Sequence, residues 1–253
     1  MRRELSAHRH LLVTILLPLA GVAVAGSTAD ASGRPAWQGC AAGAVQRMGN
    51  GSRAYVAVAG NALAARTTPG GRVIARFDAY NENAFPTLFS VRARKVDAHC
   101  RASWYLVQLP LRPNGRTAWV AARRVRLASV TTRIDVDLSK RRLRLYISGR
   151  EELTTRAGIG ARSTPTPVGR FYVNQILVPA RPFGPFGPAA FGVSAFSPAL
   201  ANWAQGGPIA IHGTNDPGSI GAAVSHGCIR ISDAAARRLY GLVLAGTPVF
   251  IHR

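Results

Sequence analysis

Two short stretches, Ile211-His212-Gly213-Thr214 and Ser225-His226-Gly227-Cys228, decide how the second half of this chain is interpreted. They place two histidines and a cysteine near one another in a sequence of 253 residues that holds only 3 cysteines and 6 histidines. A cysteine becomes a nucleophile when a neighbouring base or cation favours its thiolate, and imidazole is such a base. A glycine beside each histidine lets the backbone pack closely around a reactive group. The two stretches therefore predict a cysteine nucleophile with a histidine base.

The residues from His212 to Pro217, followed by Ser225 to Arg230, resemble the signature of L,D-transpeptidases with a YkuD-type catalytic domain. The loop Thr164-Pro165-Thr166-Pro167-Val168-Gly169-Arg170-Phe171 is similar to a Thr-Pro-x-Gly-x-Phe stretch in the same family. The resemblance implies an enzyme that cross-links the stem peptides of bacterial peptidoglycan, without a metal or another cofactor. It also implies a catalytic domain over residues 131–253, built as a β-sandwich with a short helix after the catalytic cysteine.

The same resemblance implies a role for each residue of the signature. The first histidine would be the general base, its ring oriented by a carbonyl or hydroxyl just after it, and the second would support the site. Backbone amides at the cysteine would form the oxyanion hole, and an arginine would anchor a substrate carboxylate. The expected catalytic residues are Cys228, His212, His226, Gly227 and Ser225, and the expected substrate-binding residues are Arg230, Thr214 and Gly213.

Other functions remain open for these residues. Water in place of the acceptor amine would make the same site an L,D-carboxypeptidase, and a catalytic fold that has lost activity would be a cell-wall binding protein. The intact signature argues against the second alternative. Histidine and cysteine side chains also suit zinc, but the spacing His226-Gly227-Cys228 is unusual for zinc ligands and no nearby glutamate offers a base. Asp216, the only nearby carboxylate, precedes Pro217 and is expected to shape its loop.

Apolar periodicity places the signature on strands and loops. Ile134, Val136 and Leu138 alternate with polar residues, as do Leu143, Leu145 and Ile147, which predicts a β-hairpin. Residues 208–211 form an apolar run that predicts a buried strand ending at the first signature histidine. Ser232-Asp233 predicts the cap of a helix over residues 234–244. The Pro-, Gly- and Phe-rich stretch at 179–207 is either a lid or cleft wall or a merely structural loop.

Residues 54–128 predict a separate, small β domain. Short apolar runs alternate with turns such as Thr68-Pro69-Gly70-Gly71, and no helical period is present. Leu63-Ala64-Ala65-Arg66 and Ala118-Trp119-Val120 resemble the opening and closing strands of bacterial SH3-like domains. We expect at least one of Trp104 and Trp119 to lie in the core of this barrel. The predicted fold class is therefore mainly β, an SH3-like barrel followed by the YkuD-type sandwich.

The N-terminus predicts export to the periplasm or cell wall. Arg2-Arg3 precedes an apolar run, residues 11–25, that is too short for a comfortable membrane span and ends in Ala23-Val24-Ala25. We expect residues 1–31 to contain a cleaved signal peptide and the start of the mature tail, with an uncleaved anchor as the alternative. Residues 32–53 are expected to be a linker. Outside the cytosol, Cys40 and Cys100 can pair, or both can be buried free thiols.

The net charge of the chain limits the kinds of partner that it is expected to bind. The chain has 32 basic and 11 acidic side chains, a formal net charge of +21. A field of this sign favours polyanions. For an exported protein, these are anionic cell-wall polymers in addition to the stem peptides, whereas nucleic acid binding would rest on charge alone and is not expected. A generally basic, solvated surface is the alternative explanation.

Overall fold

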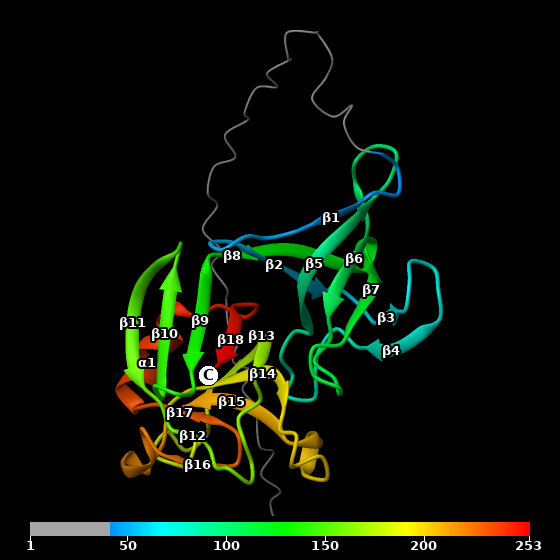
Figure 1. The fold of residues 1–253 in the computed structure, drawn as a ribbon. Coiled ribbons are helices and arrows are strands. Elements are labelled where there is room, and N and C mark those ends of the chain that lie inside the picture. The colour runs from blue at the N-terminus through cyan, green and yellow to red at the C-terminus, as the bar shows by residue number, and fades with distance from the viewer. Residues whose placement is uncertain (1–40) are drawn as a thin grey trace, which may run out of the picture. The chain divides into compact units, whose positions relative to one another are not determined.

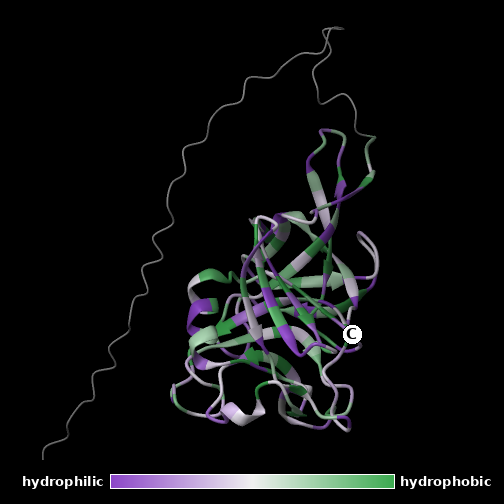
Figure 2. Ribbon diagram, turned by 60° about the vertical axis from the view of Figure 1, so that its left-hand side comes forward, coloured by the Kyte–Doolittle hydropathy of each residue, from purple (hydrophilic) through white to green (hydrophobic). Residues whose placement is uncertain are grey.

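The strands of this protein follow its alternation of apolar and polar residues. The computed structural model describes residues 41–253, and hydrophobic and hydrophilic positions alternate along several strands in Figure 2. Successive side chains of a strand point to opposite faces, so alternation buries one face and leaves the other wet. The described chain contains eighteen strands, one α-helix and three short 3-10 helices. The prediction of a mainly β protein is confirmed.

The first half of the described chain forms one sheet (Figure 1). Its strands run in the order β4-β3-β7-β6-β5-β2-β8, and β1 pairs with β5. The core beneath it is apolar, and the rings of Phe77 and Phe89 meet edge to face at 4.9 Å. The strands are β1 (Val45–Arg47), β2 (Ala54–Ala59), β3 (Leu63–Arg66), β4 (Val73–Phe77), β5 (Leu88–Val96), β6 (Ala102–Gln108), β7 (Thr117–Ala121) and β8 (Val125–Val130).

Two expectations for this half are wrong. Trp104 and Trp119 are both half-buried and neither belongs to the core, because Tyr105 and Val120, their neighbours along the strands, point inward instead. Of the predicted linker, residues 32–53, the part before residue 41 lies outside the described residues, and the remainder contains β1, which pairs antiparallel with β5. An edge strand is held by backbone hydrogen bonds, which do not require a strand-like residue composition. The Gly- and Ala-rich sequence around β1 therefore did not indicate a strand.

The second half forms a sandwich around its own core. Its strands run in the order β11-β10-β9-β18-β13-β14-β15-β17, and β12 pairs with β16 in a separate two-stranded sheet. The strands are β9 (Thr132–Asp137), β10 (Arg142–Ile147), β11 (Arg150–Arg156), β12 (Ile159–Gly160), β13 (Gly169–Leu177), β14 (Ala190–Phe196), β15 (Pro208–His212), β16 (Ala223–Ser225), β17 (Ile229–Arg230) and β18 (Pro248–His252).

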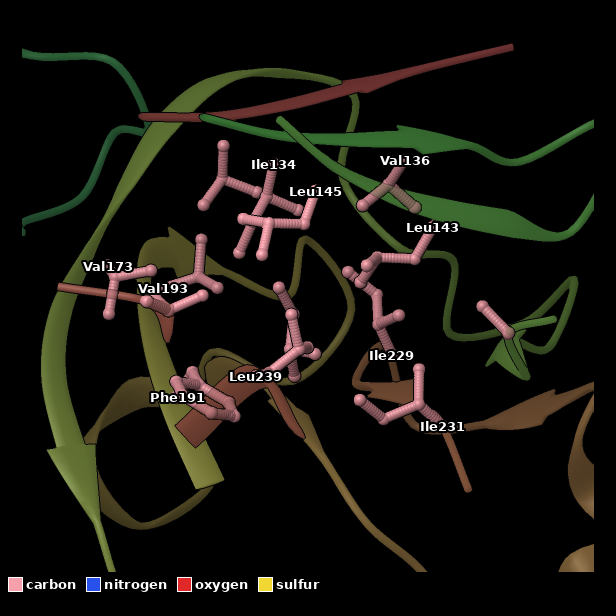
Figure 3. Packing of buried hydrophobic residues seen from close by; sticks show 14 of the residues in the cluster. Ile134, Val136, Leu143, Leu145, Val173, Phe191, Val193, Ile229, Ile231 and Leu239 are labelled. Atoms are coloured by element: carbon pink, nitrogen blue, oxygen red, sulfur yellow. The ribbon is translucent and has the colours of Figure 1, made fainter. Parts of the chain in front are cut away.

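One strand, β13, belongs to both layers of this sandwich. Residues Gly169–Tyr172 pair with β18, and Val173–Leu177 pair with β14. The predicted hairpin is confirmed as β9 and β10, with Leu145 opposite Ile134. Figure 3 shows side chains from this hairpin facing those of β14, β17 and the helix across the core.

The helix after the signature, α1 (Asp233–Leu242), begins one residue before the predicted start and ends two residues earlier than predicted. Ser232 is its N-cap, and the Ser232 hydroxyl accepts a hydrogen bond from the Ala235 amide at 3.2 Å. Leu239 is buried against the sandwich core. The 3-10 helices are η1 (Ala122–Arg124), η2 (Ala204–Gly206) and η3 (Pro217–Ser219).

The two halves share a small core of their own. Tyr172 of β13 is fully buried beside Val56 and Leu88 of the first sheet. Its hydroxyl lies 3.2 Å from the carbonyl oxygens of Leu88 and Gln108, and the Gln108 side chain donates to the carbonyl of Arg170 at 2.9 Å. Burial raises the pKa of Tyr172, so this phenol remains a hydrogen-bond donor.

The expected signal peptide and Cys40 lie outside the described residues. Cys100 is disulfide-bonded and Cys228 is a free thiol. Within residues 41–253, no helix combines the length and apolar character that crossing a bilayer requires.

Candidate active site

The two signature stretches meet at one cavity of about 660 Å³. His212 ends strand β15 and Cys228 lies in the loop before β17, and both residues line this cavity. The parallel pairing of β15 with β17, in which His212 lies opposite Arg230, fixes this arrangement. Of the predicted site residues, the cavity is lined by His212, Ser225, His226, Cys228 and Arg230.

His212 is held as a neutral base. Its Nδ1 lies 2.5 Å from the carbonyl oxygen of Gly213, and because a carbonyl can only accept, Nδ1 carries the proton. The lone pair is then on Nε2. The side chain is buried, and this desolvation lowers the pKa of His212 below that of a free imidazole, although the Gly213 carbonyl acts in the opposite direction. Phe186 covers the ring edge to face at 5.0 Å.

Cys228 is also biased toward its uncharged form. Desolvation raises the pKa of the thiol, while a hydrogen bond with the backbone of Ala210 and the positive charge of Arg230 lower it. Burial therefore favours the neutral forms of both the Cys228 thiol and the His212 imidazole over a charged pair.

Ser225 organises the cysteine loop through two hydrogen bonds. Its hydroxyl donates to the carbonyl of Cys228 at 2.6 Å and accepts from the amide of Gly227 at 3.1 Å. The Gly227 amide, which was expected to be an oxyanion donor, thus has an acceptor within its own loop in this structure. Gly227 serves backbone geometry instead. Its φ is +117°, and a Cβ there would meet Ile209 at 2.8 Å.

The Thr-Pro-Thr-Pro loop, residues 164–167, is hydrogen-bonded to the loop that contains Cys228. Thr164 donates through its hydroxyl to the carbonyl of Ser225 at 2.9 Å. The buried hydroxyl of Thr166 donates to the carbonyl of Gly227 and accepts from the amide of Gly160, both at 2.9 Å. The prolines limit the backbone freedom of this loop, so these threonines are held in place.

Gly213 and Thr214 do not line the cavity, although both were expected to bind substrate. Gly213 packs so tightly that a Cβ would lie 2.4 Å from Asp233 Oδ1. The same carboxylate accepts a hydrogen bond from the Thr214 amide at 2.9 Å, and the Thr214 hydroxyl accepts from the Asp216 amide at 3.1 Å. These residues position the carbonyl that holds His212.

Arg230 is half-buried at the cavity wall, and Nη1 lies 3.4 Å from Asp216 Oδ2. The Asp216 side chain is 61% exposed, so this ion pair is a weak one. His226 is exposed, and its ring lies 5.0 Å from that of Trp203 in a tilted stack. Within residues 41–253, no three His, Cys, Asp or Glu side chains gather in a group that could hold a metal.

Residues 131–251 match the family model described as "YkuD: L,D-transpeptidase catalytic domain". The YkuD protein of Bacillus licheniformis is 38% identical over 123 residues, which is 49% of this chain and 67% of that protein. The chain belongs to the YkuD family. The YkuD protein of Bacillus subtilis (strain 168) is also 38% identical, over 47% of this chain and 65% of that protein. This chain thus spans just under two thirds of the Bacillus subtilis YkuD.

Solved structures also match part of the chain. An L,D-transpeptidase of Enterococcus faecium is 26% identical over 48% of this chain and 49% of that chain, with a TM-score of 0.39. An L,D-transpeptidase from Mycobacterium smegmatis is 17% identical over 66% of this chain and 90% of that chain, also with a TM-score of 0.39.

The YkuD signature did not indicate several residues of this cavity. Phe186 and Trp203 cover the two histidines from the stretch at 179–207, which is therefore a cleft wall. Asn83 of the first half lines the cavity, and its side chain donates to Gln175 Oε1 at 3.0 Å. In the sequence, only the Phe-rich composition of residues 179–207 indicated that this stretch could line the site. Asn83 lies in a turn far away in the sequence, where no pattern relates it to the signature.

Proposed function

We propose that this YkuD-family protein is a peptidoglycan L,D-transpeptidase that forms 3→3 cross-links through a cysteine acyl-enzyme. One observation carries the proposal: His212, whose Nδ1 proton is held by the Gly213 carbonyl so that Nε2 is unprotonated, lines the same cavity as the free thiol Cys228. A base of fixed tautomer beside a thiol is what nucleophilic acyl transfer requires. Family membership supports an acyltransferase of this type.

In the first step, the sulfur of Cys228 attacks the carbonyl carbon of the amide that joins the L-centre of the diamino acid to the terminal D-alanine of a donor stem. His212 Nε2 takes the thiol proton as the C–S bond forms. The tetrahedral intermediate then collapses, the C–N bond breaks, and His212 gives that proton to the departing amine of D-alanine. The donor tripeptide remains on Cys228 as a thioester.

The negative oxygen of the intermediate needs backbone donors. The Gly227 amide is engaged by Ser225, whereas the Cys228 amide has no backbone or side-chain acceptor among the described residues. The Cys228 N–H is thus the oxyanion donor that the signature loop offers. Ser225 keeps this N–H oriented by holding the carbonyl of the same residue at 2.6 Å.

In the second step, the side-chain amine of an acceptor stem attacks the thioester. His212 removes a proton from that amine and returns it to the sulfur as the C–S bond breaks, so the enzyme is regenerated. Arg230 would bind a substrate carboxylate with its guanidinium, giving up its weak pair with Asp216. Water as the acceptor would instead release a tripeptide.

We also propose roles for the first half of the chain and for its N-terminus. The first sheet is taken as a bacterial SH3-like domain that positions the catalytic half, supported by the shared core at Tyr172. Export to the periplasm or cell wall is supported by the apolar N-terminal run, and the disulfide at Cys100 fits an oxidising compartment.

The test is mass spectrometry of the products formed from a disaccharide-tetrapeptide by the purified chain, beside a Cys228→Ala variant. We expect a dimer that has lost one D-alanine, absent with the variant. Tripeptide without dimer would assign carboxypeptidase activity instead. An unchanged substrate, from a chain whose Cys228 is not acylated by a carbapenem, would contradict the enzyme and leave a binding protein.

A further inference from the structure

A second cavity, of about 330 Å³, lies in the first sheet, away from the catalytic cysteine. Arg66 ends β3 and Arg76 lies in β4, and the two strands pair as a hairpin. Arg123 and Arg124 belong to η1, directly after β7, which pairs with β3. The topology thus directs two basic segments to one groove. We call it the arginine groove, lined by Arg66, Arg76, Arg123, Arg124, Asp78 and Trp104 among others.

The arginine groove carries an uncompensated positive charge. It contains four guanidinium groups and one carboxylate, that of Asp78, and none of the four arginines forms an ion pair within residues 41–253. Within residues 41–253 the arginines that form ion pairs, Arg144, Arg230 and Arg238, all lie in the second half of the chain. Like charges converging on one groove repel one another, and an anionic ligand would relieve that repulsion.

The lining also indicates what kind of anion fits. Guanidinium groups bind phosphate oxygens in bidentate geometry, and arginine is the residue best suited to this. Trp104 and Phe77 are half-buried in the groove and add apolar surface between the charges. A ligand that alternates phosphates with short carbon segments meets both features. Nucleic acid would favour a row of exposed aromatic rings for successive bases, whereas this groove offers one indole.

We propose that the arginine groove binds a phosphodiester-linked polyol or sugar chain. The groove is separate from the catalytic cavity, so binding there would hold the protein on an anionic polymer while the YkuD half acts on another substrate. The proposal stands whether or not the chain is a transpeptidase.

The experiment titrates the full chain with a fluorescent synthetic oligo(glycerol phosphate) at several salt concentrations. The test variant is Arg123→Ala/Arg124→Ala, whose side chains are exposed. Its matched control is Arg142→Ala/Arg150→Ala, two exposed arginines of β10 and β11 that remove the same charge from the other half. Thermal unfolding of both variants verifies that they fold.

We expect the test variant to bind the oligomer at least about tenfold more weakly. The plot of log association constant against log salt concentration should become less steep by roughly 1 to 2, since two phosphate contacts are lost. The control variant and Cys228→Ala should bind like the natural chain. Equal loss in both double variants would mean diffuse attraction and overturn the proposal. Equal binding of poly-L-glutamate, or tighter groove-dependent binding of a single-stranded oligonucleotide, would overturn the assigned ligand class.

Discussion

Arg112 Nη2 lies 2.5 Å from the carbonyl oxygen of Ser197, so the first half of the chain holds a loop of the catalytic cleft. The same nitrogen lies 2.7 Å from the carbonyl of Gly206, and the guanidinium covers the Phe196 ring at 5.4 Å. Asn114 adds two hydrogen bonds to the backbone of Phe196, both at 2.9 Å. The loop clamped in this way, residues 197–207, carries the indole that stacks on His226.

Loss of the clamp should weaken substrate binding more than the chemical step. For Arg112→Ala, we expect KM for the donor stem to rise about tenfold with kcat changed far less, because uniform binding is lost while the base and thiol remain in place. Arg112→Lys should fall in between, since an ammonium keeps the charge but not the planar fork. Steady-state kinetics measure this. Arg126→Ala, an exposed arginine of β8, is the control, and a similar KM increase there would contradict the clamp.

The effect of Arg112 should pass through Trp203. We therefore expect the effects of Arg112→Ala and Trp203→Ala on KM to be non-additive. In a chain that already carries Trp203→Ala, Arg112→Ala should raise KM by much less than it does in the natural chain. A double-mutant cycle on KM measures this coupling. Trp203→Phe keeps an aromatic ring and should retain most of the coupling, whereas fully additive effects would show that the two residues act separately.

Activity should be lost on acidification only at a pH below the pKa of a free histidine. Burial lowers the pKa of His212, so its imidazole remains a neutral base at a pH where a free histidine, with a pKa of about 6.5, is already protonated. The rate of Cys228 acylation by a carbapenem should accordingly fall only below about pH 6.5. The unfolded chain binds this proton first, so the free energy of unfolding should also decrease as the pH drops through that range. An acid limb at or above the free imidazole value would contradict the buried, neutral base.

Thr166→Val should destabilise the protein measurably. The variant keeps the shape but removes the hydroxyl that serves the Gly227 carbonyl and the Gly160 amide, leaving two buried polar groups without partners. We expect a loss of about 2 kcal/mol or more in the free energy of unfolding, measured by urea denaturation. Thr166→Ser keeps the hydroxyl and should cost far less. Equal stability of the two variants would show that water can replace this contact.

Local patterns predicted most of the catalytic half. The hairpin containing Ile134, the strand ending at His212 and the helix cap at Ser232 all follow from periodicity or capping chemistry within short windows. The same windows indicated the thiol and its base. They could not show that the Gly227 amide is already bonded, because that depends on which way the Ser225 hydroxyl points after folding.

Contacts between the halves were beyond the reach of sequence patterns. Asn83 and Arg112 lie in turns whose composition suits many loops, and their roles arise from strands that pair much later in the chain. The inward direction of Tyr105, which leaves Trp104 at the groove, likewise depends on strand register rather than on residue type.

The buried contact of Tyr172 with the first sheet also restricts how this architecture can evolve. A recombination event that exchanged the first half for an unrelated module would leave a phenol, the Gln108-bonded carbonyl of Arg170 and an apolar patch facing a surface that was not shaped for them. The two halves are therefore expected to be inherited together, and substitutions at Leu88 or Val56 to be accompanied by changes on β13.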